Sequence, residues 1–323
     1  MKSFEELCQS IKENNAEMEE AYQEEKRENK KKNKIMLTTC LIVDIVILLG
    51  MTLIKKTIGN SGIDAFIFFI FSSVGPIFVI DFFIALITSL FFPQKQSTYR
   101  EIYKNKVIPK LVENFYEKTE YFPNKGMPRQ IYHEGKYEAY DNYYSDDYME
   151  TTIDGKYLMD MAEVHTEEEH TSTDSKGNET TTTITLFHGI FAKIMLDKSI
   201  GCTLRICRGS NWDKSKERLQ MDSDEFEKKF NVYTTDKIVG MQILTPDIME
   251  ALLAFEKKSP YAFDIYIRAN DLYLRFHCGT MFEASFLKQG TIDEKSLKYY
   301  YDVLDFIKCF TDEMIQTIHD VEI

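Results

Sequence analysis

The longest apolar stretches of the sequence lie between residues 35 and 92. The first, Ile35 to Ile54, has about 20 residues, the length of a helix that crosses the hydrocarbon core of a bilayer. The second, Ala65 to Phe92, is long enough to cross with some tilt. A short connection that contains glycines separates the two. The pattern therefore predicts a transmembrane hairpin of two helices over residues 35–92.

Basic side chains lie outside the predicted hairpin on both sides, whereas the connection between the spans has few. Cytoplasmic segments next to membrane spans are enriched in lysine and arginine. We therefore expect a cell-membrane protein with two spans and with both termini in the cytoplasm. The basic cluster that precedes the first span is also suited to anionic lipid headgroups. It comprises Lys26, Arg27, Lys30, Lys31, Lys32 and Lys34.

Two acidic residues, Asp44 and Asp81, lie within the predicted spans. An ionised carboxylate inside a bilayer costs about 2.5–3.5 kcal/mol on insertion scales, so such a residue is a candidate functional group by default. Three interpretations are open: protonated side chains in a helix interface, recognition charges for a basic residue of another membrane protein, and a proton or cation site. The third requires an oligomer, because two helices alone do not enclose a pore.

Residues 1–34 form a charged segment in which sparse apolar residues recur at spacings of four and three. This spacing predicts an amphipathic helix with a short heptad seam. Asn15 occupies a position at which a buried asparagine can fix a parallel dimer, so it is a candidate oligomer contact. The alternative is a single helix that lies on the folded domain or on the membrane surface. The seam comprises Phe4, Cys8, Ile11, Asn15, Met18 and Tyr22.

Residues 99–323 form a folded domain in which helical and strand-like patterns alternate. Strands joined by polar turns, with a closing amphipathic helix, predict an α+β fold with a mostly antiparallel sheet and flanking helices. Thr245 before Pro246 is typical of a helix start. The expected helices cover 99–121, a short segment capped by Asp222 or Asp224 that ends near Phe230, a segment from Pro246, and 297–318. The expected strands cover 156–165, 181–197, 202–208, 262–268 and 272–278, with a polar tip at 166–180.

The sequence contains no GxGxxG after a strand, no GxxxxGK[ST], no GxSxG and no HExxH. His165 and His170 flank three glutamates, but no third anchored ligand for a metal is evident. The tyrosine-rich and acidic segment 128–154 lacks the ligand spacing of a calcium loop, and we interpret it as a solvated strand edge or a packing cluster. We therefore expect a protein that is not an enzyme, with no catalytic, cofactor-binding or metal-binding residues.

Charge and cysteine content limit the expected partners and the expected cell compartment. The net charge of -13 argues against nucleic acid as a partner, because nucleic-acid binding depends on lysine and arginine at the phosphates. The six cysteines lack the spacing of a disulfide framework. We expect all six to be reduced, which agrees with a cytosolic domain.

Seven short stretches carry a family resemblance: Asp146-Asp147, Glu163-Val164, Phe187 to Phe191, Asp224 to Tyr233, Ile243 to Pro246, Leu272 to Leu274 and Phe282-Glu283. In order and spacing they resemble a bacterial membrane family catalogued as domain-of-unknown-function family 3137. Together they cover most of residues 130–290. One departure is His188, where the family more often has arginine. The resemblance implies a two-helix membrane anchor and a cytoplasmic domain, and it implies no activity.

These observations favour a membrane-anchored interaction or scaffold protein whose cytoplasmic domain binds a partner. The expected partners are the lipid bilayer and either another membrane protein or a second copy of the chain. One alternative is a subunit of an oligomeric ion channel or transporter that uses Asp44 and Asp81. The other is a hydrolase at the membrane face, with a site assembled from distant residues.

Overall fold

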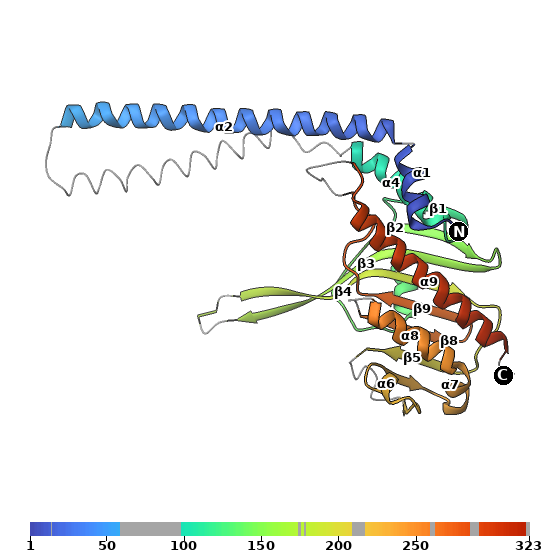
Figure 1. Cartoon of the computed structure of the whole chain (residues 1–323). Coiled ribbons are helices and arrows are strands. Elements are labelled where there is room, and N and C mark those ends of the chain that lie inside the picture. Colours follow the sequence, from blue (N-terminus) through green and yellow to red (C-terminus); the bar gives the residue numbers. More distant parts are fainter. Residues whose placement is uncertain are drawn as a thin grey trace. The chain divides into compact units, whose positions relative to one another are not determined.

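The computed structural model describes residues 1–13, 15–58, 98–173, 176–177, 179–208, 217–258, 262–284 and 291–320. The chain divides into two compact units. One consists of residues 1–14 and 103–323, and the other consists of residues 15–102. The first unit contains the sheet and most of the helices (Figure 1).

Nine strands of the described residues form one sheet in the order β1-β2-β3-β4-β9-β8-β5-β7-β6. Every neighbouring pair is antiparallel. The predicted α+β fold with an antiparallel sheet and flanking helices is therefore confirmed. The strands are β1 (Glu117–Phe122), β2 (Asn142–Ile153), β3 (Tyr157–Thr173), β4 (Glu179–Met195), β5 (Thr203–Cys207), β6 (Glu217–Leu219), β7 (Asn231–Thr234), β8 (Phe263–Arg268) and β9 (Asp271–Phe276).

Several helices begin where local capping chemistry predicts. The backbone N–H of Ile248 donates to the Thr245 hydroxyl at 3.4 Å, so Thr245 caps α8 as expected. The short helix α6 is capped by Ser223, whose hydroxyl accepts from the N–H of Phe226, and not by a neighbouring aspartate. The described helices are α1 (Phe4–Glu13), α2 (Ala16–Ile58), α4 (Thr98–Glu113), α5 (Arg129–Glu134), α6 (Asp224–Glu227), α7 (Lys237–Ile243), α8 (Pro246–Lys258) and α9 (Glu294–Asp320).

The sheet has an apolar core on both faces. On one face, Phe306 of α9 and Phe255 of α8 stack on each other and contact Phe263 and Phe276 of the sheet. Figure 1 shows α8 and α9 running across this face. On the other face, Tyr132 of α5 packs into a buried cluster. Its sheet members are Tyr148, Ala162, Val164, Phe187, Phe191, Tyr266 and Tyr273.

The tyrosine-rich segment is part of the core, as the packing interpretation expected. Tyr137, Tyr140 and Tyr143 pack against the buried cluster around Tyr132. Their rings lie 5.5–5.7 Å from the Tyr132 ring, at tilted or edge-on angles. Such geometries are the favoured ones for aromatic pairs, so this segment closes one face of the sheet.

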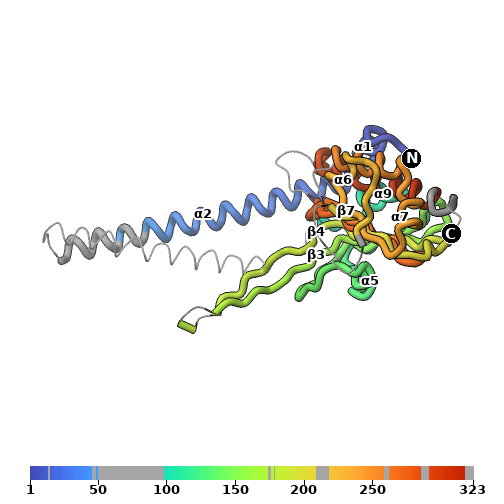
Figure 2. Tube along the Cα trace, turned by 90° about the horizontal axis from the view of Figure 1, so that it is seen from below, coloured from blue at the N-terminus to red at the C-terminus, as the bar shows by residue number. Residues whose placement is uncertain are grey.

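The hairpin of β3 and β4 is longer than predicted. Residues 166–173 and 179–180, expected in a polar tip, continue the two strands up to the pair Thr173 and Glu179. Figures 1 and 2 show both strands extending well beyond the rest of the sheet. The reason is the threonine content, because β-branched side chains favour strands. Thr171 and Thr181, for example, share a cross-strand hydrogen bond of 3.1 Å.

Residues 1–34 are not one continuous helix as predicted. α1 ends at Glu13, α2 begins at Ala16, and Asn15 lies between them outside either helix. In α1, Cys8 and Ile11 are buried, and the Phe4 ring lies 5.6 Å from Tyr301 of α9. The first half of the proposed heptad seam therefore packs on the α+β domain, as the alternative interpretation expected.

The expected helix over 99–121 ends early. α4 stops at Glu113, and residues 117–122 form β1, which pairs with β2. The helical spacing of apolar residues did not reveal this strand, because its partner lies about thirty residues further along the chain and edge pairing leaves little local periodicity.

The first predicted span lies within α2, whereas the second, 65–92, lies outside the described residues. Within the described ranges, no single helix meets the length and hydropathy expected of a membrane span. One bent pair meets it by length and composition: α7 followed by Pro246–Lys257 of α8, with a bend of 67°.

Candidate functional site

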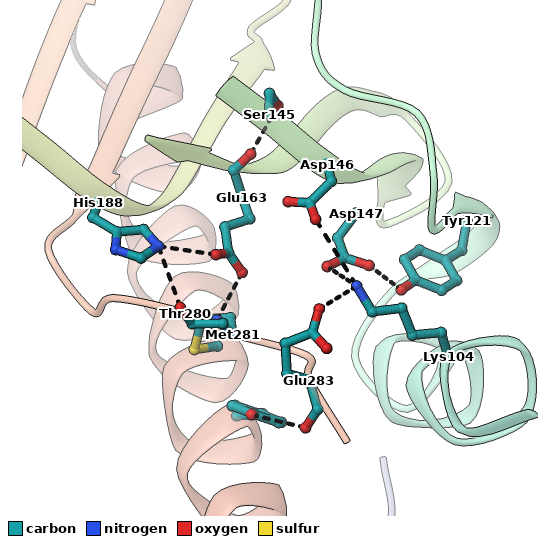
Figure 3. A network of polar contacts seen from close by, with 11 residues as sticks. Lys104, Tyr121, Ser145, Asp146, Asp147, Glu163, His188, Thr280, Met281 and Glu283 are labelled. Atoms are coloured by element: carbon teal, nitrogen blue, oxygen red, sulfur yellow. Dashed lines mark hydrogen bonds and ion pairs between the residues drawn. The ribbon is translucent and has the colours of Figure 1, made fainter. Parts of the chain in front are cut away.

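Four carboxylates from β2, β3 and the segment after β9 lie near one another (Figure 3). We call Asp146, Asp147, Glu163 and Glu283 the carboxylate cluster. Lys104 of α4 points into it, and His188 of β4 lies against Glu163 (Figure 3). The cluster therefore joins α4, β2, β3, β4 and the segment after β9.

An irregularity in β2 places the two aspartates. The register between β2 and β3 shifts between Asp146 and Met149, so one extra residue is accommodated on β2. Asp147 adopts a positive φ of 51°, which a non-glycine residue seldom adopts. Bulges of this kind redirect side chains and are common next to functional sites. Here the bulge turns both aspartates toward Lys104.

Lys104 is the cation of the cluster. Its Nζ lies 2.6 Å from Oε1 of Glu283, 2.9 Å from Oδ2 of Asp147 and 4.0 Å from Oδ2 of Asp146. The Lys104 side chain is 13% exposed and that of Asp147 is fully buried. Burial works against the charged lysine, but the carboxylates of Asp147 and Glu283 outweigh it and raise the Lys104 pKa. The ammonium thus connects α4 to β2 through Asp147 and to the segment after β9 through Glu283.

Asp147 is held from the other side by the Tyr121 hydroxyl, which donates a short hydrogen bond to Oδ1. Burial raises the pKa of Asp147 to about 7, although Lys104 and Tyr121 both favour its charged form. Burial also raises the pKa of Asp146. The two aspartates therefore keep their protons to higher pH than exposed aspartates do.

Glu163 binds the segment that follows β9. Its Oε2 accepts a hydrogen bond of 2.7 Å from the backbone N–H of Met281, and its Oε1 lies 3.1 Å from Nε2 of His188. Burial raises the pKa of Glu163 to about 7, against the effect of the Met281 N–H. The carboxyl group of Glu163 on β3 therefore connects His188 of β4 to the segment after β9. We call this segment, residues 277–284, the Met281 loop.

A glycine allows this loop to approach the sheet. Gly189 has a φ of +155°, and a Cβ atom at this position would lie 1.9 Å from the carbonyl oxygen of Phe276 and 2.7 Å from the nitrogen of Cys278. The N–H of Gly279 donates to the carbonyl of His188 at 2.9 Å. A side chain at position 189 would therefore separate His188 and Glu163 from the loop that completes the site.

The histidines of the site do not form a catalytic relay. His188 stacks on His165 with ring centroids 4.5 Å apart, and burial lowers the pKa of both. The Thr280 hydroxyl lies 3.4 Å from Nε2 of His188, the same nitrogen that contacts Glu163. In a nucleophile–histidine–carboxylate relay the two partners contact opposite nitrogens. The contacts of His188 therefore connect β4 to Glu163 and to the loop after β9.

The oxygens of Asp146, Asp147 and Glu283 lie within 4.8 Å of one another, which is close enough to surround a metal ion. Lys104 already lies among them, at 2.6–4.0 Å from all three. A divalent cation would have to displace the lysine ammonium, whose positive charge already pairs with these carboxylates. The residues thus form a lysine-centred ion-pair network.

The residues singled out within the sequence are dispersed. Asp44 lies on α2, is half-buried, and its Oδ1 has no hydrogen-bond partner among the described residues. Asp81 lies outside the described residues. His165 and His170 lie on β3, where His165 pairs with His188 of β4 and His170 with Thr182. All six cysteines are free thiols in the structure.

Sequence reasoning did not identify the carboxylate cluster as a site. The information was nevertheless present, because Asp146-Asp147, Glu163, His188 and Glu283 all belong to the stretches that carry the family resemblance. These stretches lie far apart in the chain and share no motif spacing. Only the pairing of β2, β3 and β4 and the return of the chain after β9 bring them together.

Comparison with known proteins agrees with the resemblance. The family model described as "Protein of unknown function (DUF3137)" matches residues 185–314, a range that includes His188 and Glu283. No curated protein matches the chain. Among solved structures, the crystal structure of the mycobacterial trehalose monomycolate transport factor A, TtfA, is similar at a TM-score of 0.36 and 5% identity. The similarity covers 66% of this chain and 97% of that chain, and it is too weak to indicate a shared fold or function.

Proposed function

We propose that this chain is a membrane-anchored interaction protein. Helices over residues 35–54 and 65–92 anchor it in the cell membrane, and the α+β domain lies in the cytoplasm. The anchor also recognises another membrane protein through the carboxyl groups of Asp44 and Asp81. The α+β domain binds proteins and performs no reaction of its own.

The exposed apolar side chains of α2 carry this proposal. A helix in contact with water keeps one polar face, and a large exposed apolar surface marks contact with a membrane or a protein. Between Ile35 and Leu49, α2 exposes large apolar side chains, among them Leu37 at 66% and Leu41 at 61%. The basic cluster of residues 26–34 comes directly before them, which favours a membrane with anionic headgroups as the contacting surface.

The carboxylate cluster supports an interaction role for the domain. Its carboxylates contact Lys104 and the backbone N–H of Met281. His188 contacts both Glu163 and the Thr280 hydroxyl through the same nitrogen. Lys104 belongs to α4, the helix that follows the second predicted span in the sequence. In this proposal the network connects α4, which follows the membrane anchor, to the sheet of the α+β domain that binds the partner.

One alternative function has a specific observation in its favour. The Oδ1 atom of Asp44 is buried without a hydrogen-bond partner among the described residues. A buried intramembrane carboxyl is a feature of ion pathways as well as of helix contacts. In an oligomeric channel or transporter, Asp44→Asn and Asp81→Asn would abolish ion flux and leave assembly intact.

The proposal is tested by crosslinking in native membranes, followed by affinity purification and mass spectrometry. The full chain is compared with the Asp44→Asn/Asp81→Asn double variant. Asp222→Asn, which changes an exposed carboxylate of the α+β domain, is the matched control. We expect a membrane protein that is captured by the wild type and the control and lost from the double variant.

Two results would contradict the proposal. Capture of the same membrane partner by the double variant would show that the two carboxyl groups do not recognise it. Absence of any membrane partner from all three samples would leave the channel alternative, which an ion-flux assay on the purified chain then tests directly.

A further inference from the structure

The outer part of the β3–β4 hairpin is a two-stranded ribbon, to which no third strand pairs among the described residues. We call residues 167–173 of β3 and 179–185 of β4 the ribbon. β2 pairs with β3 only as far as Asn142 and Glu167, and β9 pairs with β4 only from Ile190 onward. Every described side chain of the ribbon from residue 169 onward is exposed. Figures 1 and 2 show the ribbon standing clear of the rest of the sheet.

A two-stranded ribbon of this composition needs a further strand. Isolated hairpins are at best marginally stable in water, and independent stability requires three or more strands with an apolar face. The ribbon has no packed face of its own, and Ile184 is 50% exposed. Additional pairing along one of its edges would supply the missing strand.

The inner part of the β3 edge of the ribbon, at residues 167–169, is closed to such pairing. The N–H of Asp141 donates to the carbonyl of Glu167 at 2.8 Å, and the Asp141 side chain accepts from the N–H of Glu169 at 2.7 Å. Asn142 binds the Glu169 side chain at 2.7 Å. Three consecutive glutamates, 167–169, also place like charges along this edge. Blocked hydrogen bonds and charges are the features that prevent a strand edge from pairing.

The edge of β4 is uncharged and suited to pairing with another strand. From Thr180 to Leu186 it contains five threonines, one isoleucine and one leucine, with no charge, proline or glycine. β-branched, uncharged strands of six or seven residues are the ones that pair most readily with another chain. The bulge at Leu186, where Thr166 opposes Phe187 and Glu167 opposes Thr185, marks the root of this open edge.

We propose that the β4 edge, Thr180 to Leu186, pairs antiparallel with the same edge of a second copy of this chain. An edge that pairs with itself gives a closed twofold dimer, β3-β4-β4-β3. The acidic β3 strands then lie on the two outer sides of the four-stranded ribbon, far from each other. In the register that places Ile184 opposite its counterpart, residues 182–186 of the two copies pair with each other, and the exposed Ile184 side chains meet. This inference rests on the proposed function, because it names the protein partner that the α+β domain binds.

The test is site-directed crosslinking of the full chain in native membranes with a short bis-maleimide. The exposed Cys309 is first changed to serine, which gives the background chain. Ile184→Cys is placed on the β4 edge, and Thr171→Cys on the same ribbon but on β3 is the matched control. We expect at least a tenfold higher yield of covalent dimer for Ile184→Cys than for Thr171→Cys or the background.

A second variant measures the association without a crosslink. Ile184→Lys introduces a charge at the centre of the pairing edge and should weaken dimerisation of the detergent-solubilised chain at least tenfold, whereas Thr171→Lys should leave it unchanged. Equal crosslinking of the two cysteine variants, or a dimer that Ile184→Lys leaves intact, would overturn the inference. Crosslinking of Ile184→Cys to a different protein would also overturn it. Each of these failures leaves the capture of a membrane partner by Asp44 and Asp81 unaffected, so the two proposals fail separately.

Discussion

The backbone N–H of Met281 donates a hydrogen bond of 2.7 Å to Oε2 of Glu163, which joins the segment after β9 to the middle of β3. The neighbouring residue, Phe282, has a positive φ of 57° and is fully buried, so the loop is held in a conformation that non-glycine residues seldom adopt. Glu283, which follows, reaches Lys104. The hydrogen bond to Glu163 and the ion pair with Lys104 thus fix this loop between the sheet and α4.

Stability should decrease as the pH rises through the titration of Glu163. Burial raises the pKa of this carboxyl from 4.5 to about 7 in the folded protein, so the folded state binds its proton more tightly than the unfolded state. The resulting stabilisation is complete below about pH 4.5 and is lost as the pH rises to about 7. Glu163→Gln imitates the protonated group and should escape this loss.

Thermal unfolding of the full chain in detergent, measured from pH 5 to pH 8, checks this expectation. The melting temperature of Glu163→Gln relative to the wild type should increase with pH, by about 4–8 °C if about 2 kcal/mol is involved. A difference that is constant over this range would show that Glu163 titrates normally.

Removal of the lysine from the carboxylate cluster should destabilise the domain strongly. Lys104→Met leaves the fully buried Asp147 and its neighbour Glu283 without their cation. Breaking a buried ion pair from one side costs about 3–5 kcal/mol, equivalent to roughly 6–20 °C in melting temperature for a domain of this size. Lys228→Met changes an exposed lysine elsewhere in the domain and should have an effect within about 0.5 kcal/mol. Equal melting temperatures of the two variants would contradict the role given to Lys104.

A single methyl group at position 189 should open the site. In Gly189→Ala the new Cβ would lie 1.9 Å from the carbonyl oxygen of Phe276, so the strand or the loop must move. We expect a loss of more than about 3 kcal/mol in the free energy of unfolding, measured by chemical denaturation. Gly177→Ala changes a residue with a positive φ, but its Cβ would meet no atom of the described residues beyond its chain neighbours within 4 Å, so it should cost only about 1 kcal/mol. Equal losses in the free energy of unfolding for the two variants would show that the close approach of the loop to β4 does not stabilise the fold.

Local chemistry allowed parts of the fold to be predicted. The Thr245 cap, the β8–β9 hairpin and the long closing helix follow from residues that are close in sequence. β1 and β2 were harder to identify, because β1 pairs with a strand beyond α5 and the tyrosines of β2 do not alternate cleanly with polar residues. The break at Asn15 interrupts a regular heptad spacing and has no proline or glycine beside it.

The carboxylate cluster could not be assembled from the sequence for a different reason. Asp146 and Asp147 reach Lys104 through a bulge, and Glu163 reaches Met281 because Gly189 lets the loop approach. Neither feature has a sequence pattern of its own. The family resemblance named most of these residues, and the fold shows that they lie together in one site.

The membrane anchor is the central claim, and alkaline carbonate extraction of membranes that contain the full chain tests it most directly. A matched chain that lacks residues 35–92 serves as the control. We expect the full chain to remain in the membrane pellet, since helices that span the bilayer resist extraction, and the shortened chain to be released. Release of the full chain into the supernatant, to the same extent as the control, would contradict the anchor and the function proposed on it.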